Sequence, residues 1–446
     1  MTPSRLNIVC LVAAAGCAKV GETPRDGAAS DGGCVGVQCQ QVRCDSGETT
    51  ISGTAFAPNG TLPLYNVMVY VPSAPLTPFP LGVTCDRCGS VASGRPIASA
   101  ISDHEGKFTI KNAPAGRDIP VVFQVGKWRR KVTIPTVTAC QDNPITDSHL
   151  TRLPRNRQEG DVPRIAVTTG ECDTLGCLLL KIGVDPAEVG VAGEDKSVTF
   201  YKGSGVFPKL YGPPNMTDAE TLWRNEGELA KHDMTLLSCE CAEVDNKGPD
   251  AQWAMTKYLA RGGRIFGSDF MYVWYRDSPD PHLSGAMKIA GGAPQGASPL
   301  LIDTSFPKGK ALADWMMFVD PGVLRYGQIP SKQVYANLTS AMPPTAQVWA
   351  TSMSYQTALP GPRIVTINTP AGVPVEQQCG RAVHLDAHIA PAYGVDPAPN
   401  EPVKYFPTNC QAELNRGEEA LAFLLFDLAG CIQDDKVPLG PPVIVP

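Results

Sequence analysis

The pattern of apolar and polar residues changes its period near residue 163. From residue 51 to about 140, short runs rich in β-branched and aromatic residues lie at 67–71, 107–110, 121–125 and 131–134, and apolar and polar residues alternate at 107–110 and 131–134. This is a strand pattern, and turn sequences such as Pro58-Asn59-Gly60 separate the runs. No helical period lies between them, so this region predicts a small all-β sandwich. A polar linker is expected at 141–162.

After residue 163, predicted strands and helices alternate, which indicates a parallel sheet with helices on its faces. We expect an α/β domain over 163–435 and a C-terminal tail over 436–446. The strands are predicted at 164–168, 198–201, 234–238 and 264–268, with helices at 173–183, 250–261 and 418–428. A capping box at Thr217-Asp218-Ala219-Glu220 predicts a further helix running to about residue 231.

The segment at about 275–375 is rich in Pro and Gly and less regular. It predicts one helix near 308–318 and strands at 347–350 and 363–368. We expect this insertion to cover one end of the sheet.

The N-terminus has the pattern of an export signal. A short n-region with one basic residue precedes an apolar run at 6–15, which is too short to span a bilayer. The run ends in Ala14-Ala15-Gly16-Cys17, which resembles the lipobox of bacterial lipoproteins. The resemblance implies a signal peptide at 1–16, a lipid on Cys17 that binds the membrane, and a tether at 17–50. Because no Asp follows Cys17, the outer membrane is the expected location. An ordinary cleaved signal is the alternative.

Cysteine content favours the same compartment. The chain has 15 cysteines, more than a reducing cytosol usually holds without metal sites. Thirteen lie outside Cys10 and Cys17, so at least one stays unpaired if the others form disulfides. For Cys85 and Cys88, disulfides to Cys44 or Cys140 are expected, with a zinc site or a redox pair as alternatives. The disulfide candidates are Cys34, Cys39, Cys44, Cys85, Cys88, Cys140, Cys172, Cys177, Cys239, Cys241, Cys379, Cys410 and Cys431.

Charge gives no sign of a nucleic-acid partner, because the net charge is −6. The one basic run is Lys127-Trp128-Arg129-Arg130-Lys131. On a strand it divides between two faces, so a solvated surface is expected, with contact to acidic envelope sugars as the alternative.

Three sequence stretches at 51–60, 102–108 and 113–116 carry a resemblance to a known module. They read Ile-Ser-Gly-Thr with Asn-Gly, Ser-Asp-His-Glu-Gly-Lys-Phe, and Ala-Pro-Ala-Gly. Together they resemble the carboxypeptidase regulatory-like, transthyretin-type module, over roughly ninety residues. That resemblance implies a spacer or binding sandwich without catalytic residues. The insertion at 72–95 departs from its simple pattern.

The later region resembles a flavodoxin-like fold of the class I glutamine-amidotransferase type, and within it the trehalose-utilisation-like group. The resemblance rests on Leu236-Leu237-Ser238, Gly262-Gly263-Arg264 and Gly380-Arg381-Ala382-Val383. The whole chain also resembles a group of bacterial lipoproteins, some of them labelled tryptophan synthase alpha chain. The sequence does not support that label, because an eightfold β/α barrel needs eight strand–helix repeats, which differ from this chain in pattern and in length.

The candidate site is His384, Asp386 and His388. Alternate residues of a strand share a face, so the three side chains are expected to line up. Ligands of open α/β sheets lie outside the carboxyl ends of strands, where Glu240, Ser268 and Asp269 would join them. Two imidazoles and a carboxylate are candidate ligands for a divalent metal. Hydrogen-bonded structural residues are the alternative, and no other cofactor is expected.

A catalytic triad is the second candidate for this site. His384-Leu385-Asp386 has the His-x-Glu spacing of the amidotransferases, with Asp in place of Glu. The turn at 266–270 lacks their cysteine, however, and has Phe270 where a glycine follows. Ser268 is the weak candidate nucleophile.

The leading functional hypothesis is a non-catalytic envelope lipoprotein that binds an envelope ligand, with carbohydrate as the candidate class. The alternative is a hydrolase of a carbohydrate or amide that uses the strand-end cluster. Convergence of the candidate side chains in an open pocket would favour the hydrolase.

Overall fold

The computed structural model describes residues 36–438 and 440, apart from 91, 171, 174, 205–212, 293, 323–324, 332, 354–359, 390–409 and 411–412. The sequence expectations for Cys17, the signal peptide and Cys34 therefore lie outside the described residues. Within the described part, residues from Gly36 onward form one contact unit.

The N-terminal part of this unit begins with a short 3-10 helix at Gly36–Gln40 and continues as strands up to residue 145. We call strands β1–β7 the β module. A sheet of four described strands has the order β3-β2-β5-β6, and a sheet of three has the order β4-β1-β7. The two sheets face each other, because the rings of Phe108 and Phe123 meet edge to face at 5.5 Å. The strands are β1 Thr50–Thr54, β2 Met68–Pro72, β3 Pro96–Ile101, β4 Lys107–Ile110, β5 Gly116–Val125, β6 Trp128–Val137 and β7 Asp142–Ile145.

Four predicted strands are present as β2, β4, β5 and β6. The segment at 141–162, expected as a linker, contains β7 and the one-turn helix α1 (Ser148–Thr151). Strand β7 pairs with β1 in parallel, so this segment completes the three-stranded sheet. Residues after α1 connect to the second part of the chain.

The second part contains one large mixed sheet. In the described residues its order is β11-β10-β8-β12-β13-β22-β21-β20-β16-β17, with β9 paired to β10. Strands β11 to β22 are parallel to one another, and β21 to β17 continue the sheet antiparallel. Their bounds are β8 Ile165–Thr168, β9 Val189–Val191, β10 Val198–Lys202, β11 Thr217–Asp218, β12 Met234–Leu237, β13 Arg264–Ser268, β16 Leu300–Ile302, β17 Gln328–Ile329, β20 Ala346–Ser352, β21 Gly361–Thr369 and β22 Gly380–Leu385.

The parallel half of the sheet agrees with the predicted alternation of strands and helices. The antiparallel half corrects the expectation for the insertion at 275–375. That segment extends the sheet by strands instead of only covering one end. Its remaining strands form two small sheets, in the orders β14-β19 and β15-β18-β23. They are β14 Met287–Ile289, β15 Pro294–Gln295, β18 Gln333–Tyr335, β19 Leu338–Ala341 and β23 Ala387–His388.

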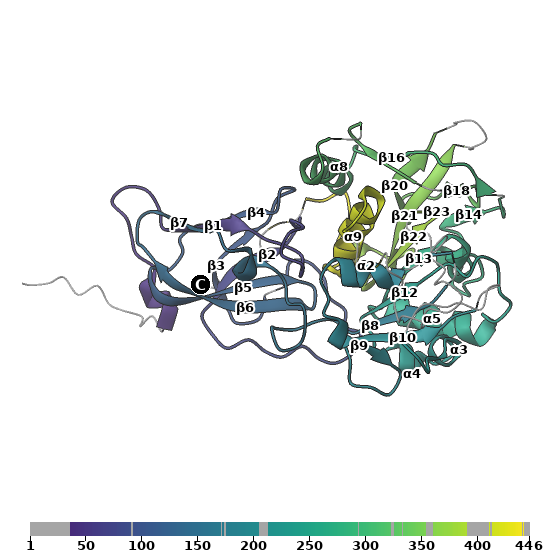
Figure 1. Ribbon diagram of the computed structural model, residues 1–446, viewed down its shortest axis with the longest axis horizontal. Coiled ribbons are helices and arrows are strands. Elements are labelled where there is room, and N and C mark those ends of the chain that lie inside the picture. The colour runs from purple at the N-terminus through teal and green to yellow at the C-terminus, as the bar shows by residue number, and fades with distance from the viewer. Residues whose placement is uncertain are drawn as a thin grey trace, which may run out of the picture. The chain divides into compact units, whose positions relative to one another are not determined.

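Helices cover both faces of the mixed sheet (Figure 1). Helices α2, α8 and α9 contribute to a core that continues into the β module. Helices α3–α6 contribute to a separate core on the other face. The helices are α2 Leu175–Lys181, α3 Glu220–Trp223, α4 Glu226–Leu229, α5 Pro249–Ala260, α6 Val273–Arg276, α7 Pro281–Ser284, α8 Pro307–Val319 and α9 Arg416–Ala429.

Helix ends were predicted less well than helix positions. The predicted capping box at Thr217 is wrong: Thr217 and Asp218 form β11, and α3 begins without a side-chain cap. The chain then breaks at Asn225, whose side chain caps α4. A capping box does open α9, where the Asn415 side chain accepts from the Glu418 amide and Glu418 reaches back. Its signature, Asn-x-x-Glu, follows the same rule.

Five disulfides join described cysteines, and they correct the expected pairing of Cys85 and Cys88. The pairs are Cys44–Cys140, Cys85–Cys379, Cys88–Cys431, Cys172–Cys241 and Cys177–Cys410. Cys39 is disulfide-bonded as well. Cys85 and Cys88 therefore bind the loop between β2 and β3 to the second part of the chain, and Cys44 pairs with Cys140 instead. Among the described cysteines, Cys239 is free and buried.

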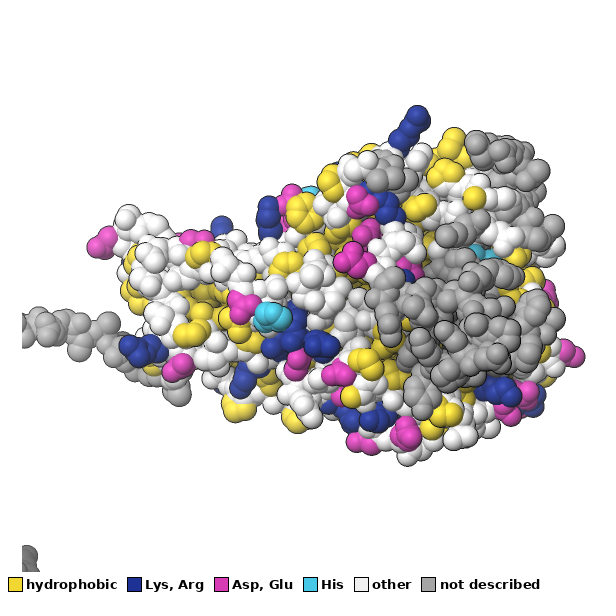
Figure 2. Space-filling view, in the orientation of Figure 1, with side chains coloured by type: hydrophobic (Ala, Val, Ile, Leu, Met, Phe, Trp, Pro, Cys, Tyr) yellow, Lys and Arg dark blue, Asp and Glu magenta, His cyan; other side chains and the backbone are white. Residues whose placement is uncertain are grey.

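The surface shows no single-sign field on the face drawn in Figure 2, where basic and acidic side chains are interspersed. No helix in the described ranges combines the length and the apolar content needed to cross a membrane.

Candidate functional site

The candidate residues lie at the carboxyl ends of β13 and β22. Strand β13 ends at Ser268, and Asp269 turns the chain into the short helix at Asp269–Tyr272 with φ +45°. This left-handed conformation is uncommon for a residue other than Gly, and such strain concentrates at functional sites. Strand β22 ends at Leu385, and β23 follows after Asp386. Ser268, Asp269, His384, Asp386 and His388 are all buried.

His388 lies between two carboxylates. Its Nδ1 is 3.0 Å from Oδ2 of Asp173, in a hydrogen bond. Its Nε2 is 3.3 Å from Oδ2 of Asp269, an ion-pair distance without hydrogen-bond geometry. Burial lowers the pKa of His388, but the charges of Asp173 and Asp269 outweigh burial and raise it to about 10.

Cys239 completes this cluster from the end of β12. Its Sγ lies 3.4 Å from Oδ2 of Asp269. Its backbone amide donates to the Ser268 hydroxyl at 3.1 Å, so Ser268 is held by the neighbouring strand end. Burial, and then the charges of Asp269 and Asp173, raise the pKa of the Cys239 thiol. Burial also raises the pKa of Asp269.

Asp386 has separate partners. It accepts from the Leu338 amide at 2.9 Å, from Asn337 at 3.1 Å and from Arg363 at 3.2 Å. Burial raises its pKa to about 7, although Arg363 opposes that shift. These contacts hold the segment around β19 against the end of β22.

His384 points into an aromatic environment. The rings of Tyr275 and Tyr272 meet it edge to face at 5.4 and 6.5 Å. Neither ring nitrogen has a hydrogen-bond partner in the described residues, and burial lowers the pKa of His384 to about 3. His384 is therefore neutral at physiological pH.

The structure does not bring His384, Asp386 and His388 together as one ligand set, because each has its own neighbours. The strand alternation on which that expectation rested ends at Leu385. Among the described residues, the group with ligand atoms within 4.8 Å of one another is Cys172, Cys239 and His388, all buried. Cys172 is bonded to Cys241 in this structure. Glu240 forms an ion pair with Lys247 at 2.6 Å.

The contact of Asp173 with His388, and the place of Cys239 beside His388, were not predicted from the sequence. Both residues follow carboxyl ends of parallel strands, β8 and β12, which the strand-end rule already singled out. Asn337, which donates to Asp269 at 2.7 Å, comes from the irregular insertion and had no such signal.

A separate cavity of about 470 Å³ lies at the opposite end of β22, where that strand begins. Hydroxyl, amide, carboxylate and amino groups line it, together with a short apolar loop. Two hydrogen bonds join β21 to the C-terminal segment that lines the cavity. Thr366 donates to Asp435 at 3.0 Å, and Asn368 donates to the backbone carbonyl of Gln433 at 3.0 Å. The lining residues are Pro344, Thr345, Gln347, Thr366, Asn368, Gly372, Val373, Pro374, Val375, Gln378, Asp434, Asp435 and Lys436.

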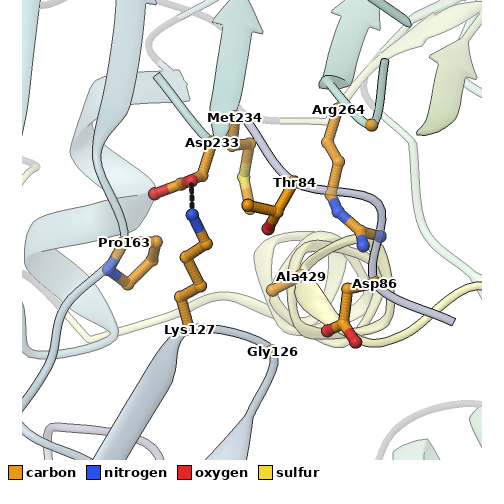
Figure 3. Close-up of a pocket in the computed structure, with 10 residues that line it drawn as sticks. Thr84, Asp86, Gly126, Lys127, Pro163, Asp233, Met234, Arg264 and Ala429 are labelled. Atoms are coloured by element: carbon orange, nitrogen blue, oxygen red, sulfur yellow. Dashed lines mark hydrogen bonds and ion pairs between the residues drawn. The ribbon is translucent and has the colours of Figure 1, made fainter. Parts of the chain in front are cut away.

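The junction between the β module and the mixed sheet holds only a small cavity of about 30 Å³ (Figure 3). Lys127 reaches from the β5–β6 turn to Asp233, while Asp86 and Arg264 lie on the other side of the cavity. Burial raises the pKa of Asp86, and the charge of Arg264 offsets part of that shift. With room for about one water, this cavity is a packing gap rather than a ligand site.

This junction corrects the expectation for the basic run at 127–131. Trp128 is fully buried and its ring packs 5.3 Å from that of Phe426 in α9. Arg129 is buried and pairs with Asp161 at 2.8 Å. The run is therefore largely an internal contact surface.

Comparisons with known proteins give distant structural neighbours. No model of a known protein family matches the chain. No curated protein matches it either. Among solved structures, it is similar to a putative ThuA-like protein from Parabacteroides merdae, with 13% identity, 63% of this chain and 94% of that chain covered, and a TM-score of 0.32.

Two further neighbours are similar over much the same extent. A putative ThuA-like protein from Bacteroides uniformis has 9% identity, covers 55% of this chain and 86% of that chain, and has a TM-score of 0.31. A cytoplasmic protein from Salmonella typhimurium has 12% identity, covers 61% of this chain and 100% of that chain, and has a TM-score of 0.29. The neighbours thus include trehalose-utilisation (ThuA)-like proteins, at TM-scores below those from which a shared function follows.

Proposed function

We propose that this chain is an exported lipoprotein, attached to the outer membrane through Cys17, with a non-catalytic role in binding an envelope ligand. Five disulfides between described cysteines support export, because disulfides persist in oxidising compartments and are rare in the cytosol. Two of them join the β module to the mixed sheet, so this arrangement depends on an oxidising environment.

In this proposal the β module is a carboxypeptidase regulatory-like sandwich that acts as a spacer. Its two facing sheets and the Phe108–Phe123 contact support that assignment. The mixed sheet is the flavodoxin-like, amidotransferase-type domain. Its parallel half, with helices on both faces, supports that assignment.

One contrast favours binding over hydrolysis: the strand-end cluster is buried, whereas the cavity at the start of β22 has a volume of about 470 Å³ and is lined by both polar and apolar side chains. Ser268 is fully buried, and its hydroxyl oxygen accepts a hydrogen bond from the Cys239 amide. The cavity, in contrast, has the size of a small-molecule site, and the side chains of Thr345, Gln347 and Gln378 contribute hydroxyl and amide groups to its lining. Such donors and acceptors match the hydroxyls of a sugar, so we assign an envelope carbohydrate as the ligand class.

The test uses purified chain and soluble fragments of envelope polysaccharide and peptidoglycan, with binding followed by calorimetry. Thr345→Trp places a bulky side chain at the cavity and is expected to abolish binding. Thr61→Trp, an exposed site in the β module, is the matched control and is expected to bind like the original protein. Binding that Thr345→Trp leaves unchanged would contradict the cavity assignment. Cleavage of a fragment during the incubation would favour the hydrolase instead.

A further inference from the structure

Three side chains of different chemistry converge where β12 and β13 end and where β23 follows β22. Oδ2 of Asp269 lies 3.4 Å from Sγ of Cys239 and 3.3 Å from Nε2 of His388. Ligand atoms about 2.0–2.3 Å from one tetrahedral zinc ion are separated from each other by about 3.3–3.6 Å. Both distances to Asp269 are therefore those of neighbouring ligands in such a site.

The orientation of His388 is the second observation. Its Nδ1 is hydrogen-bonded to Asp173, which leaves Nε2 directed at Asp269. Nε2 is buried and has no hydrogen-bond partner in the described residues. A carboxylate that fixes one ring nitrogen while the other faces the ion is the usual arrangement around metal-binding histidines.

We propose that Cys239, Asp269 and His388 bind a zinc ion or a similarly soft divalent cation, with Asp173 as the carboxylate that positions His388. The thiolate distinguishes this site from one for Mg²⁺ or Ca²⁺, which prefer oxygen ligands. Binding displaces the thiol proton of Cys239 and the Nε2 proton that His388 carries between its two carboxylates, and both protons leave to solvent. Because the ligands come from the ends of β12 and β13 and from β23, and the site is buried, the ion stabilises this end of the sheet.

The fourth position of the ion depends on the oxidation state of Cys172. Its sulfur belongs to the same group of close ligand atoms as Cys239 and His388. While it is bonded to Cys241, the ion has three protein ligands, and a water takes the fourth position. Reduction of that disulfide would free Cys172 to join, so reduction is expected to increase metal affinity.

The test uses the full chain, stripped of metal by a chelator without reductant, and then titrated with Co²⁺ as a spectroscopic probe and with Zn²⁺ against a chromophoric competitor. The original protein is expected to bind one ion and to show a thiolate-to-cobalt charge-transfer band with tetrahedral visible absorption. Cys239→Ser is expected to lose that band, and His388→Gln to lose at least tenfold in zinc affinity. Asp173→Asn is expected to lose about 10–100-fold.

His384→Phe is the control, because His384 lies in the tyrosine environment away from the proposed ligands. It is expected to keep both the band and the affinity. Loss of binding in His384→Phe with retention in Cys239→Ser would overturn the proposal in favour of the set expected from sequence. A non-reduced original protein that is folded but shows no thiolate band also overturns it, whether or not the variants fold.

Discussion

Lys127 and Asp233 join the β module to the mixed sheet through an ion pair of 2.6 Å between Nζ and Oδ1. Lys127 also donates to the backbone carbonyls of Pro80 and Gly82, and Asp233 accepts from the amide of Arg164 just before β8. One lysine in a β-turn thus holds a loop of its own module and the start of two sheet strands. Each side chain is only 14% exposed, so the pair is largely removed from water.

Replacing Lys127 by Met is expected to destabilise the protein by about 1–3 kcal/mol, because Asp233 and two carbonyls lose their donor in a mostly buried place. The matched control is Lys310→Met, which removes the exposed ion pair with Asp314 on α8. That change is expected to have little effect on stability, because water screens an ion pair whose lysine is fully exposed. Urea unfolding midpoints measure both, and equal effects would contradict the structural role of Lys127.

The disulfides Cys85–Cys379 and Cys88–Cys431 should keep the two parts covalently joined after the chain is cut between them. Protease cleavage near residue 157, in the segment after α1, is expected to leave both fragments in one band on a non-reducing gel. With all four cysteines changed to Ser, the fragments should separate without reductant. Cys44→Ser with Cys140→Ser is the control, because that pair lies within the β module and its loss should not separate the fragments.

The parts of the fold that sequence predicted are those that depend on local period. Strands β8, β12 and β13 and helices α5, α8 and α9 follow directly from runs of buried residues and their flanking turns. The antiparallel half of the sheet was not predicted as such. Strand β21 pairs with β22 and β20 pairs with β21, and the local apolar pattern of these strands specifies neither the partner nor the direction of pairing. Disulfide partners are likewise set by the fold, so Cys85 could not be assigned to Cys379 from spacing.

The candidate site was also predicted only in part. The rule that ligands bind outside the carboxyl ends of parallel strands correctly indicated the part of the sheet where Ser268, Asp269 and His388 lie. Alternation then failed to keep His384 and His388 on one face, because β22 ends between them and β23 pairs instead with β18. The contacts to Asp173 and Cys239 arise from neighbouring parallel strands, whose order cannot be read from any local pattern.

A buried ion network centred on Arg381 should be essential for stability. Arg381 contacts Asp427 and Asp435 at 2.9 Å each, and Lys308 contacts the same two carboxylates at 2.7 and 2.9 Å. Arg381→Leu leaves two buried carboxylates with one cation, and is expected to cost about 3–5 kcal/mol.

The control for this network is Arg276→Leu, whose partners Glu243 and Asp277 are partly exposed. It should cost about 1 kcal/mol or less. Thermal unfolding compares the two variants, and a small effect for Arg381→Leu would mean that the two carboxylates find other partners.

Lipid attachment at Cys17 predicts membrane retention. Cys17→Ser is expected to move the protein from the membrane to the soluble fraction and to abolish incorporation of labelled fatty acid. Cell fractionation and lipid labelling measure the two effects. Retention of the Ser variant in the membrane, together with an unlabelled original protein, would contradict lipid anchoring.

The pKa of His384 predicts how stability depends on pH. Burial lowers this pKa from 6.5 to about 3, so between these values the unfolded chain binds a proton that the folded chain does not. The free energy of unfolding therefore rises with pH through this window, by about 1.4 kcal/mol per pH unit from this residue. The contribution of His384 reaches its full value above about pH 6.5. His384→Phe fits the environment of Tyr272 and Tyr275 and removes the titrating group, so its unfolding midpoint should fall less steeply from about pH 6.5 to about pH 4. NMR of the His384 ring should show no titration above about pH 5. A ring that titrates near its ordinary pKa, or equal slopes for the two proteins, would show that water reaches this ring.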